Sequence, residues 1–288
     1  MNKHSPYILV LGASGMAGRT IFKYLYNTNP LKTFGTSRTN LNNPNIFLFD
    51  VKKNKIKFEN LKNNNYEYFI NCIGALRENN DNEDMDLVNS NFPIILENYC
   101  KKNKIKLIHI STDAVFSNEA GVVHEKSKTD PSDYYGKSKL MGEITKGINI
   151  RTSILGFDPI GNKGLFERVL KNRNKDIIGF TNQLWSGSTT LQLAKFISWL
   201  ILRNNFNNLS IKTNIIHFSP ISRITKYEIF KTISQLLSKN KIISGKGVKQ
   251  TRMLKTIYGK NIKLRRYSSN LKKAFSELIE FDKQYVKS

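Results

Sequence analysis

Short apolar runs alternate with amphipathic segments along the first half of the chain. Continuous apolar runs are typical of strands buried on both faces of a parallel sheet. Those that predict strands are Tyr7–Leu11, Thr33–Thr36, Ile46–Phe49, Tyr68–Ile73 and Ile105–Ile110. Helical spacing of apolar residues lies between them, over Arg19–Tyr26 and Leu87–Cys100, with Pro93 expected in a first turn or at a kink. The alternation predicts an α/β fold with a Rossmann-type, doubly wound parallel sheet.

The pattern is less regular in the second half of the chain. Ile148–Leu155 and Asn214–Phe218 predict two more strands, and Leu191–Leu202 predicts a helix between them. From Ser219 onward we expect helices and loops. We therefore expect an NADP-binding Rossmann domain over residues 1–156 and a smaller, mainly C-terminal substrate lobe over residues 157–288. Residues 189–218 are expected to return to the Rossmann sheet.

Composition narrows the class of protein. No apolar run of the 288 residues approaches the roughly 18 needed for a transmembrane helix. The segment Met1–Pro6 lacks the apolar core of a signal peptide. Two cysteines, Cys72 and Cys100, cannot form a disulfide framework, which favours a reducing compartment. We expect a soluble cytoplasmic protein that does not act at a membrane, and both a monomer and a homodimer stay open.

The formal net charge of +24 raises the alternative of a nucleic-acid partner. The lysines, however, are spread along the whole chain among Asn and Ile instead of being gathered in one segment. Such spreading favours a solvated basic surface over a polyanion site, so we expect no nucleic-acid partner. A positive field also suits an enzyme whose substrate is an anionic nucleotide.

A glycine-rich turn joins the first expected strand to the first expected helix. Its residues include Gly12, Ser14, Gly15, Met16 and Gly18. The first glycine permits a tight turn, the second lets the backbone approach a pyrophosphate, and the third allows close packing of helix on sheet. Glycines also serve other sharp turns, but the position between strand and helix indicates dinucleotide binding. The GxxGxxG spacing is that of short-chain dehydrogenases.

The end of the second expected strand bears on the choice of cofactor. An acidic residue there binds the ribose of NAD, whereas an arginine accommodates the 2′-phosphate of NADP. This chain has Ser37 and Arg38 and no carboxylate at that point. The pattern favours NADP(H), although a solvated loop arginine is the alternative reading of Arg38.

Tyr135 and Lys139 lie four residues apart on an expected helix and therefore share one of its faces. An ammonium near a phenol stabilises the phenolate and suits the pair to acid/base chemistry. Such spacing is common on helix surfaces and is weak evidence by itself. Thr112 gives it support, because it follows a buried strand at the edge where doubly wound sheets bind ligands.

These motifs together resemble the extended short-chain dehydrogenase/reductases, and within them the dTDP-4-dehydrorhamnose reductase-like group. The resemblance covers most of the chain and rests on Ile8–Gly18, Asn71–Gly74 (NCIG), Val88–Asn89, His109–Phe116 (HISTDAVF), Tyr135–Glu143 (YGKSKLMGE) and Ile150–Gly156 (IRTSILG). In its Lys/Asn-rich composition the chain also resembles the UDP-L-rhamnose synthases, including the giant-virus type. Those enzymes combine 3,5-epimerisation with 4-reduction.

The resemblance implies reduction of the C4 ketone of a UDP- or dTDP-linked 4-keto-6-deoxyhexose to an L-rhamnose nucleotide. It implies Tyr135 as proton donor, assisted by Lys139 and Thr112. It assigns further cofactor contacts to Asp50, Val51, Cys72, Ile73, Gly74 and Asn89. It assigns substrate contacts to Ala75, Arg77, Thr112, Asp113, Ala114, Trp185, Lys226 and Arg266.

The chain departs from the reductase pattern at two positions. Ala114 stands where the reductases usually carry Tyr, and Ile154 where they often carry Trp. Instead, Trp185 is expected to stack on a base or, alternatively, to be a packing residue. Arg265 and Arg266 are expected to bind a diphosphate, since arginine forks suit phosphate oxygens.

Several alternatives stay open. The acid/base for epimerisation is unassigned: Cys72 is a candidate, and an inert buried thiol is the other reading. Reduction without epimerisation is one alternative function, and a non-catalytic NADP-binding regulatory or scaffold protein is another. The four histidines (His4, His109, His124 and His217) make no metal pattern, so no metal is expected.

Overall fold

The computed structural model describes residues 5–53, 58, 65–77, 80–158, 164–172 and 175–286, so His4 and most of Met1–Pro6 lie outside the described residues. Within these ranges the largest sheet has seven strands, all parallel, in the order β11-β7-β5-β4-β1-β2-β3. Its strands are β1 (Ile8–Leu11), β2 (Thr33–Ser37), β3 (Ile46–Leu48), β4 (Tyr68–Asn71), β5 (Lys106–Thr112), β7 (Ile148–Thr152) and β11 (Ile215–His217). This is the predicted doubly wound Rossmann-type sheet, and the α/β prediction is confirmed.

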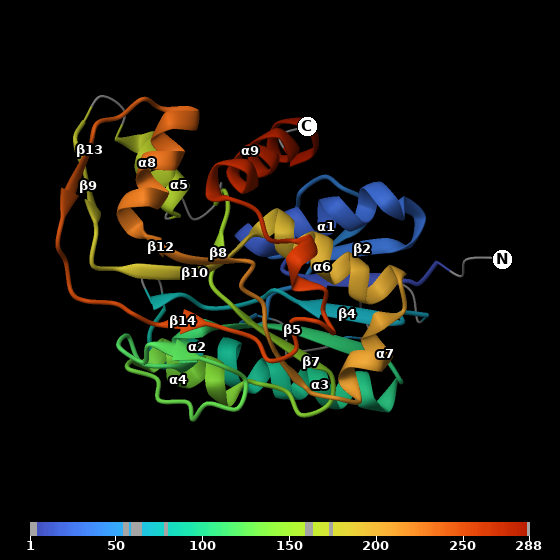
Figure 1. Cartoon of the computed structure of the whole chain (residues 1–288). Helices are drawn as coiled ribbons and strands as arrows, with labels where there is room; N and C mark the ends of the chain where they lie inside the picture. Colours follow the sequence, from blue (N-terminus) through green and yellow to red (C-terminus); the bar gives the residue numbers. More distant parts are fainter. Residues whose placement is uncertain are drawn as a thin grey trace.

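Helices cover both faces of the sheet (Figure 1). One layer contains α1 (Met16–Thr28), α6 (Thr190–Leu202) and α7 (Asn205–Ser210). The other contains α2 (Asn82–Met85), α3 (Phe92–Lys102) and α4 (Tyr134–Met141). Because apolar side chains of both layers pack on the sheet, all four residues of β1 are fully buried. This explains why the strand reads as a continuous apolar run.

The order of the strands places a topological switch point beside β1. The chain runs from β1 to β2 and β3 on one side, and then to β4, β5, β7 and β11 on the other. The carboxyl ends of β1 and β4 therefore lie next to each other at the point where the direction reverses. Open α/β sheets bind ligands at this switch point.

Smaller sheets form a second group of elements. A three-stranded sheet has the order β12-β10-β8, and β9 pairs with β13 and β6 with β14. The strands are β6 (Val122–Val123), β8 (Ile154–Leu155), β9 (Ile177–Phe180), β10 (Leu184–Thr189), β12 (Ile221–Thr225), β13 (Ile242–Gly245) and β14 (Met253–Leu254). The associated helices are α5 (Leu165–Lys171), α8 (Lys226–Leu237) and α9 (Leu271–Phe281). Figure 1 shows β9, β13, α5 and α8 together at the end far from the N-terminus.

The structure corrects three sequence predictions. The segment after Ser219 is not only helices and loops, because β12, β13 and β14 lie in it. Ile148–Leu155 forms two strands, since the chain leaves the main sheet at Ser153 and β8 pairs with β10. The predicted helix Leu87–Cys100 begins as a π-helical turn at Asp86–Asn91, and α3 follows with Pro93 in its first turn.

Candidate active site

The glycine loop lies at the carboxyl end of β1. Gly12 has a φ of +80°, which side chains disfavour, and a Cβ at Gly18 would overlap the Gly12 carbonyl. Gly15 is the N-cap of α1 and supplies no side chain to the first turn, so the helix N-terminus keeps its N–H groups for an anion. The loop is fastened to β2, because the Ala13 N–H donates to the Thr36 carbonyl at 2.7 Å. These features fit a dinucleotide pyrophosphate.

The predicted ribose-side residues follow β2 and β3. Ser37 is buried and its hydroxyl accepts a hydrogen bond from the Thr39 N–H, whereas Arg38 is exposed directly after the strand. Asp50 is half-buried, its carboxylate accepts from the Lys52 N–H at 3.0 Å, and Val51 is buried beside it. An exposed guanidinium at this point fits a 2′-phosphate.

A π-helical turn over Asp86–Asn91 lies beside the segment that follows β4. Asn89 lies in this turn and binds both backbone groups of Ala75, accepting from its N–H at 2.8 Å and donating to its carbonyl at 3.0 Å. The Asn89 amide also donates to the Ser138 hydroxyl on α4. Asn89 thus ties the segment Cys72–Ala75, which follows β4, to the helix that carries Tyr135 and Lys139. Single π-turns of this kind are frequent at functional sites.

Helix α4 presents Tyr135 and Lys139 to the end of β5. Asp133 caps the helix by accepting from the Gly136 N–H at 2.8 Å. The helix lies close to the turn after β5, because a Cβ at Gly136 would overlap the Ala114 carbonyl. The Thr112 side chain is close enough to the Tyr135 phenol to lower its pKa. The structure therefore brings together the three residues predicted to act in chemistry.

Two opposing effects act on the Tyr135 phenol. Burial raises its pKa and is the largest cause, while the nearby Thr112 side chain lowers it. The Arg77 guanidinium lies 5.1 Å from the ring centroid and also lowers the pKa. A phenol with a raised pKa is protonated at neutral pH and is able to donate its proton.

Lys139 is buried one turn after Tyr135 on α4. Its Nζ donates to the Ile110 carbonyl at 2.8 Å and lies 3.5 Å from Nε2 of His109. Burial lowers the pKa of Lys139 to about 8, although the Glu143 and Cys72 side chains act in the opposite direction. The amine can therefore exchange a proton near neutral pH.

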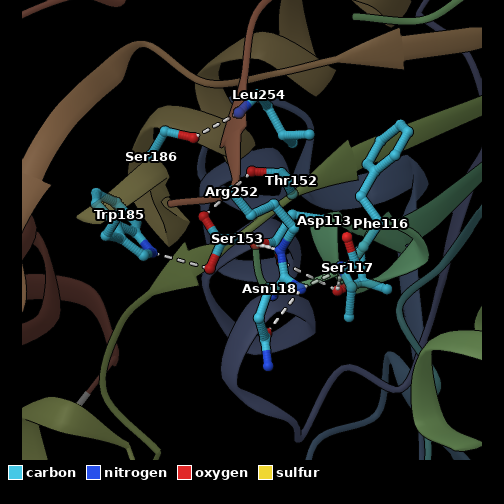
Figure 2. Close-up of polar contacts among 12 residues, drawn as sticks. Asp113, Phe116, Ser117, Asn118, Thr152, Ser153, Trp185, Ser186, Arg252 and Leu254 are labelled. Carbon is cyan, nitrogen blue, oxygen red and sulfur yellow. Dashed lines mark hydrogen bonds and ion pairs between the residues drawn. The ribbon is translucent and has the colours of Figure 1, made fainter. Parts of the chain in front are cut away.

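Asp113 forms a buried ion pair that the sequence analysis missed. Its carboxylate accepts from Nε of Arg252 at 2.9 Å, and the Arg252 guanidinium also donates to the Phe116 carbonyl and to Asn118 (Figure 2). Arg252 precedes β14, so the pair fastens the C-terminal segment over the turn that follows Thr112. Ala114 is buried in that turn.

Two cations and the Asp113 carboxylate act on Lys226. Lys226 begins α8, and the charges of Arg168 and Arg252 lower its pKa, after burial as the larger cause. The Asp113 carboxylate acts in the opposite direction. We call Arg168, Lys226 and Arg252 the cation group. Three cations against one carboxylate favour an anionic ligand.

The structure favours the packing role for Trp185, while the diphosphate role of Arg266 stays a prediction. Trp185 is 6% exposed and its indole N–H donates to the Ser153 hydroxyl at 2.9 Å (Figure 2), so it is a packing residue and not a free surface for a base. Arg266 is exposed in a 3-10 turn next to Tyr267, whose ring packs on Phe196 of α6. Arg265 is exposed in the same turn. The buried Arg252 and the half-buried Lys226 interact with Asp113.

Two kinds of feature are absent from the described residues. They contain no group of His, Cys, Asp and Glu residues suited to a metal ion. Among their helices, none has the length and apolar character required to cross a membrane.

The chain has a Rossmann-type α/β fold of the kind that binds dinucleotides. Its candidate site combines the glycine loop with Tyr135 and Lys139 on α4. The sequence matches the family model described as the RmlD substrate binding domain over residues 6–257, and the chain belongs to this family. The resemblance to dTDP-4-dehydrorhamnose reductases noted from the motifs is thereby confirmed at the level of the family. No curated protein sequence matches the chain significantly.

Solved structures share the fold at low sequence identity. A dTDP-4-dehydrorhamnose reductase from Clostridium acetobutylicum superposes with a TM-score of 0.72 at 20% identity, covering 96% of this chain and 100% of that one. The Bacillus anthracis dTDP-4-dehydrorhamnose reductase in complex with NADP gives 0.69 at 17% identity, covering 95% and 99%. The dTDP-glucose 4,6-dehydratase of Bacillus anthracis in complex with NAD gives 0.74 at 15% identity, covering 97% of each chain. Because enzymes of different activity and cofactor share this fold, the reaction has to be argued from the site.

Proposed function

We propose that the protein is an NADPH-dependent reductase of a nucleotide-linked 4-keto-6-deoxyhexose, acting on the C4 ketone to form an L-rhamnose nucleotide. The observation that supports the proposal is the placement of Tyr135 and Lys139 one turn apart on α4, with Thr112 at the end of β5 acting on the Tyr135 phenol. Membership of the RmlD substrate-binding family supports the sugar-nucleotide substrate.

The cofactor assignment rests on the loop and on the end of β2. The uncapped N-terminus of α1, with Gly12, Gly15 and Gly18, supports pyrophosphate binding, and the exposed Arg38 supports the 2′-phosphate. When bound, NADPH supplies the hydride for the sugar C4. The NADP complex of the Bacillus anthracis reductase is in agreement with this choice.

The chain supplies the proton and holds the substrate. Thr112 and Tyr135 donate hydrogen bonds to the C4 carbonyl oxygen, and Tyr135 passes its proton to that oxygen as the alcohol forms. Lys139 stabilises the resulting phenolate by its charge. The protonated state of Tyr135 required for this step agrees with its raised pKa.

The remainder of the substrate is assigned to the lobe formed by residues 157–288. The cation group, Arg168, Lys226 and Arg252, suits the diphosphate of a nucleotide sugar, since guanidinium and ammonium groups both pair with phosphate oxygens. Arg77 lies over Tyr135 and is assigned to the sugar side of the site.

Epimerisation at C3 and C5 is the finer part of the proposal, and it needs an additional acid/base. Cys72 is a poor candidate because burial raises the pKa of its thiol to about 12. Reduction without epimerisation therefore has the better support from the site. The nucleotide, UDP or dTDP, is left to experiment.

The deciding experiment supplies UDP- or dTDP-4-keto-6-deoxyglucose and NADPH without an added epimerase. NADPH oxidation only after a 3,5-epimerase is added identifies a reductase, whereas direct formation of the L-rhamnose nucleotide identifies both activities. Tyr135→Phe serves as the catalytic control and should abolish turnover while leaving NADPH binding intact. No turnover of either sugar under any of these conditions overturns the proposal in favour of a non-catalytic NADP-binding protein.

A further inference from the structure

The buried imidazole of His109 lies next to the Lys139 amine. His109 is fully buried in β5, and its Nε2 lies 3.5 Å from the Lys139 Nζ. Its other ring nitrogen, Nδ1, lies 3.0 Å from the side-chain amide nitrogen of Asn71 at the end of β4. The proposed reaction assigns no role to either residue.

The hydrogen bonds of Asn71 determine which nitrogen of His109 carries the proton. The Ile73 backbone N–H donates to the Asn71 side-chain oxygen at 3.1 Å, so that end of the amide is the acceptor. The amide nitrogen therefore faces His109 and donates to Nδ1, which has to offer its lone pair. In a neutral imidazole the proton then lies on Nε2, the nitrogen that faces Lys139.

The imidazole is neutral at working pH. Burial and the nearby Lys139 both lower the pKa of His109 well below its usual value. When Lys139 is a neutral amine, its lone pair can accept a hydrogen bond from Nε2–H. When Lys139 is an ammonium, it has no lone pair, and its protons repel the Nε2–H. The geometry therefore favours the amine.

We propose that Asn71 and His109 form a positioning pair that holds an imidazole N–H against Nζ of Lys139 and stabilises this side chain as a neutral amine. The inference rests on the proposed function for its catalytic meaning. After Tyr135 has given its proton to the substrate, the Lys139 ammonium passes one proton to the Tyr135 phenolate. A neutral tyrosine and a neutral amine result, and the amine accepts the His109 hydrogen bond until solvent water reprotonates it.

Other groups also face Lys139 and have to be weighed. The Ile110 carbonyl accepts its hydrogen bond, and the Glu143 and Cys72 side chains favour the ammonium. The Glu143 carboxylate, however, is engaged by Arg151 through two hydrogen bonds of 2.7 Å and by the Ser111 hydroxyl. His109 is the group that favours the amine by a directed hydrogen bond.

The test needs no substrate. In the full-length protein labelled with 15N-histidine, nitrogen NMR should show His109 protonated on Nε2 and unprotonated on Nδ1 from pH 6 to 9. The signal is assigned by its loss in His109→Gln, and only three other histidines compete with it. A proton on Nδ1, or a His109 that titrates in this range, overturns the proposal.

A second measurement follows Lys139 itself. Nitrogen NMR of 15N-lysine, with Lys139→Arg for assignment, should show that His109→Gln raises the pKa of Lys139 by about half a unit or more, because an amide oxygen replaces the donor. The exposed His124→Gln is the matched control and should change nothing. An unchanged Lys139 pKa in folded His109→Gln overturns the pair's role, whatever the outcome of the turnover assays. If turnover is found, the pH dependence of kcat should shift in the same direction.

Discussion

The Arg77 guanidinium lies 5.1 Å from the centre of the Tyr135 ring and forms an ion pair of 2.6 Å with Asp133, the residue that caps the helix of that tyrosine. One cation therefore acts on the candidate proton donor and on the start of its helix. The Arg77 and Asp133 side chains are 54% and 36% exposed, so the pair itself contributes little to stability. Its effect should appear in the titration of Tyr135.

We expect Arg77→Ala to raise the pKa of Tyr135, because the cation that stabilises the phenolate is removed. In the direction of reduction the protonated tyrosine is active, so the fall of kcat/KM at alkaline pH should move to higher pH. Arg203→Ala, at the exposed end of α6, provides a control of the same charge change. An alkaline limb that does not move in Arg77→Ala would contradict the electrostatic role of Arg77.

The Asp113–Arg252 pair should contribute to the stability of the protein because both of its side chains are largely buried. Its two side chains are 12% and 8% exposed. Replacing Arg252 with Met leaves a buried carboxylate without its partner, which costs about 3–5 kcal/mol in such pairs. Urea unfolding should report this loss, and the double variant Asp113→Asn/Arg252→Met should recover part of it. A single variant as stable as the wild type would show that the pair does not fasten this segment.

The contact between Asp113 and Arg252 could not be predicted from the sequence. The glycine loop and the Tyr135/Lys139 pair were predictable because each lies within one turn or one helix, where spacing in sequence fixes spacing in space. Arg252 is 139 residues from Asp113. No local periodicity links the two, since they meet only when β14 pairs with β6.

The lobe was harder to predict than the sheet for a related reason. Strands of the main sheet are buried on both faces and read as apolar runs, whereas β12 has exposed residues at Ser222 and Arg223 and shows neither a run nor an alternation. Trp185 was ambiguous because its burial depends on packing by several elements of the lobe. Sequence alone therefore predicted the elements of the main sheet better than those of the lobe.

His217 predicts a loss of stability in acid. Burial lowers its pKa to about 4, with Glu125 acting in the opposite direction. The unfolded chain, in which the histidine titrates near pH 6.5, binds the proton first. The contribution of this group is thus present above about pH 6.5 and is lost as the pH falls toward 4.

The comparison of His217→Gln with the exposed His124→Gln isolates this effect. Between pH 7 and pH 4 the free energy of unfolding of the wild type and of His124→Gln should fall more than that of His217→Gln, by roughly 3 kcal/mol. Urea titrations at several pH values measure the difference. Parallel curves for all three proteins would mean that His217 is not the acid-sensitive group.

Arg38 should control the choice between the two nicotinamide cofactors. Its exposed guanidinium follows β2, and the neighbouring Ser37 is buried. Arg38→Ala removes a charge-assisted contact with the 2′-phosphate and should raise the KM for NADPH about tenfold while leaving that for NADH nearly unchanged. Arg38→Asp should go further and favour NADH. Equal effects on both cofactors would remove Arg38 from the 2′-phosphate site.

Lys226 and Arg266 provide a paired test of where the diphosphate binds. Lys226 belongs to the cation group, whereas Arg266 is exposed in the turn beside Tyr267. Lys226→Gln should raise the KM for the nucleotide sugar about tenfold with little change in kcat, because a charge-assisted contact to the non-reacting diphosphate is lost. Arg266→Gln should leave both parameters unchanged. The reverse result is a KM that changes in Arg266→Gln and does not change in Lys226→Gln. It would place the diphosphate at the turn Leu264–Arg266 and not at the cation group.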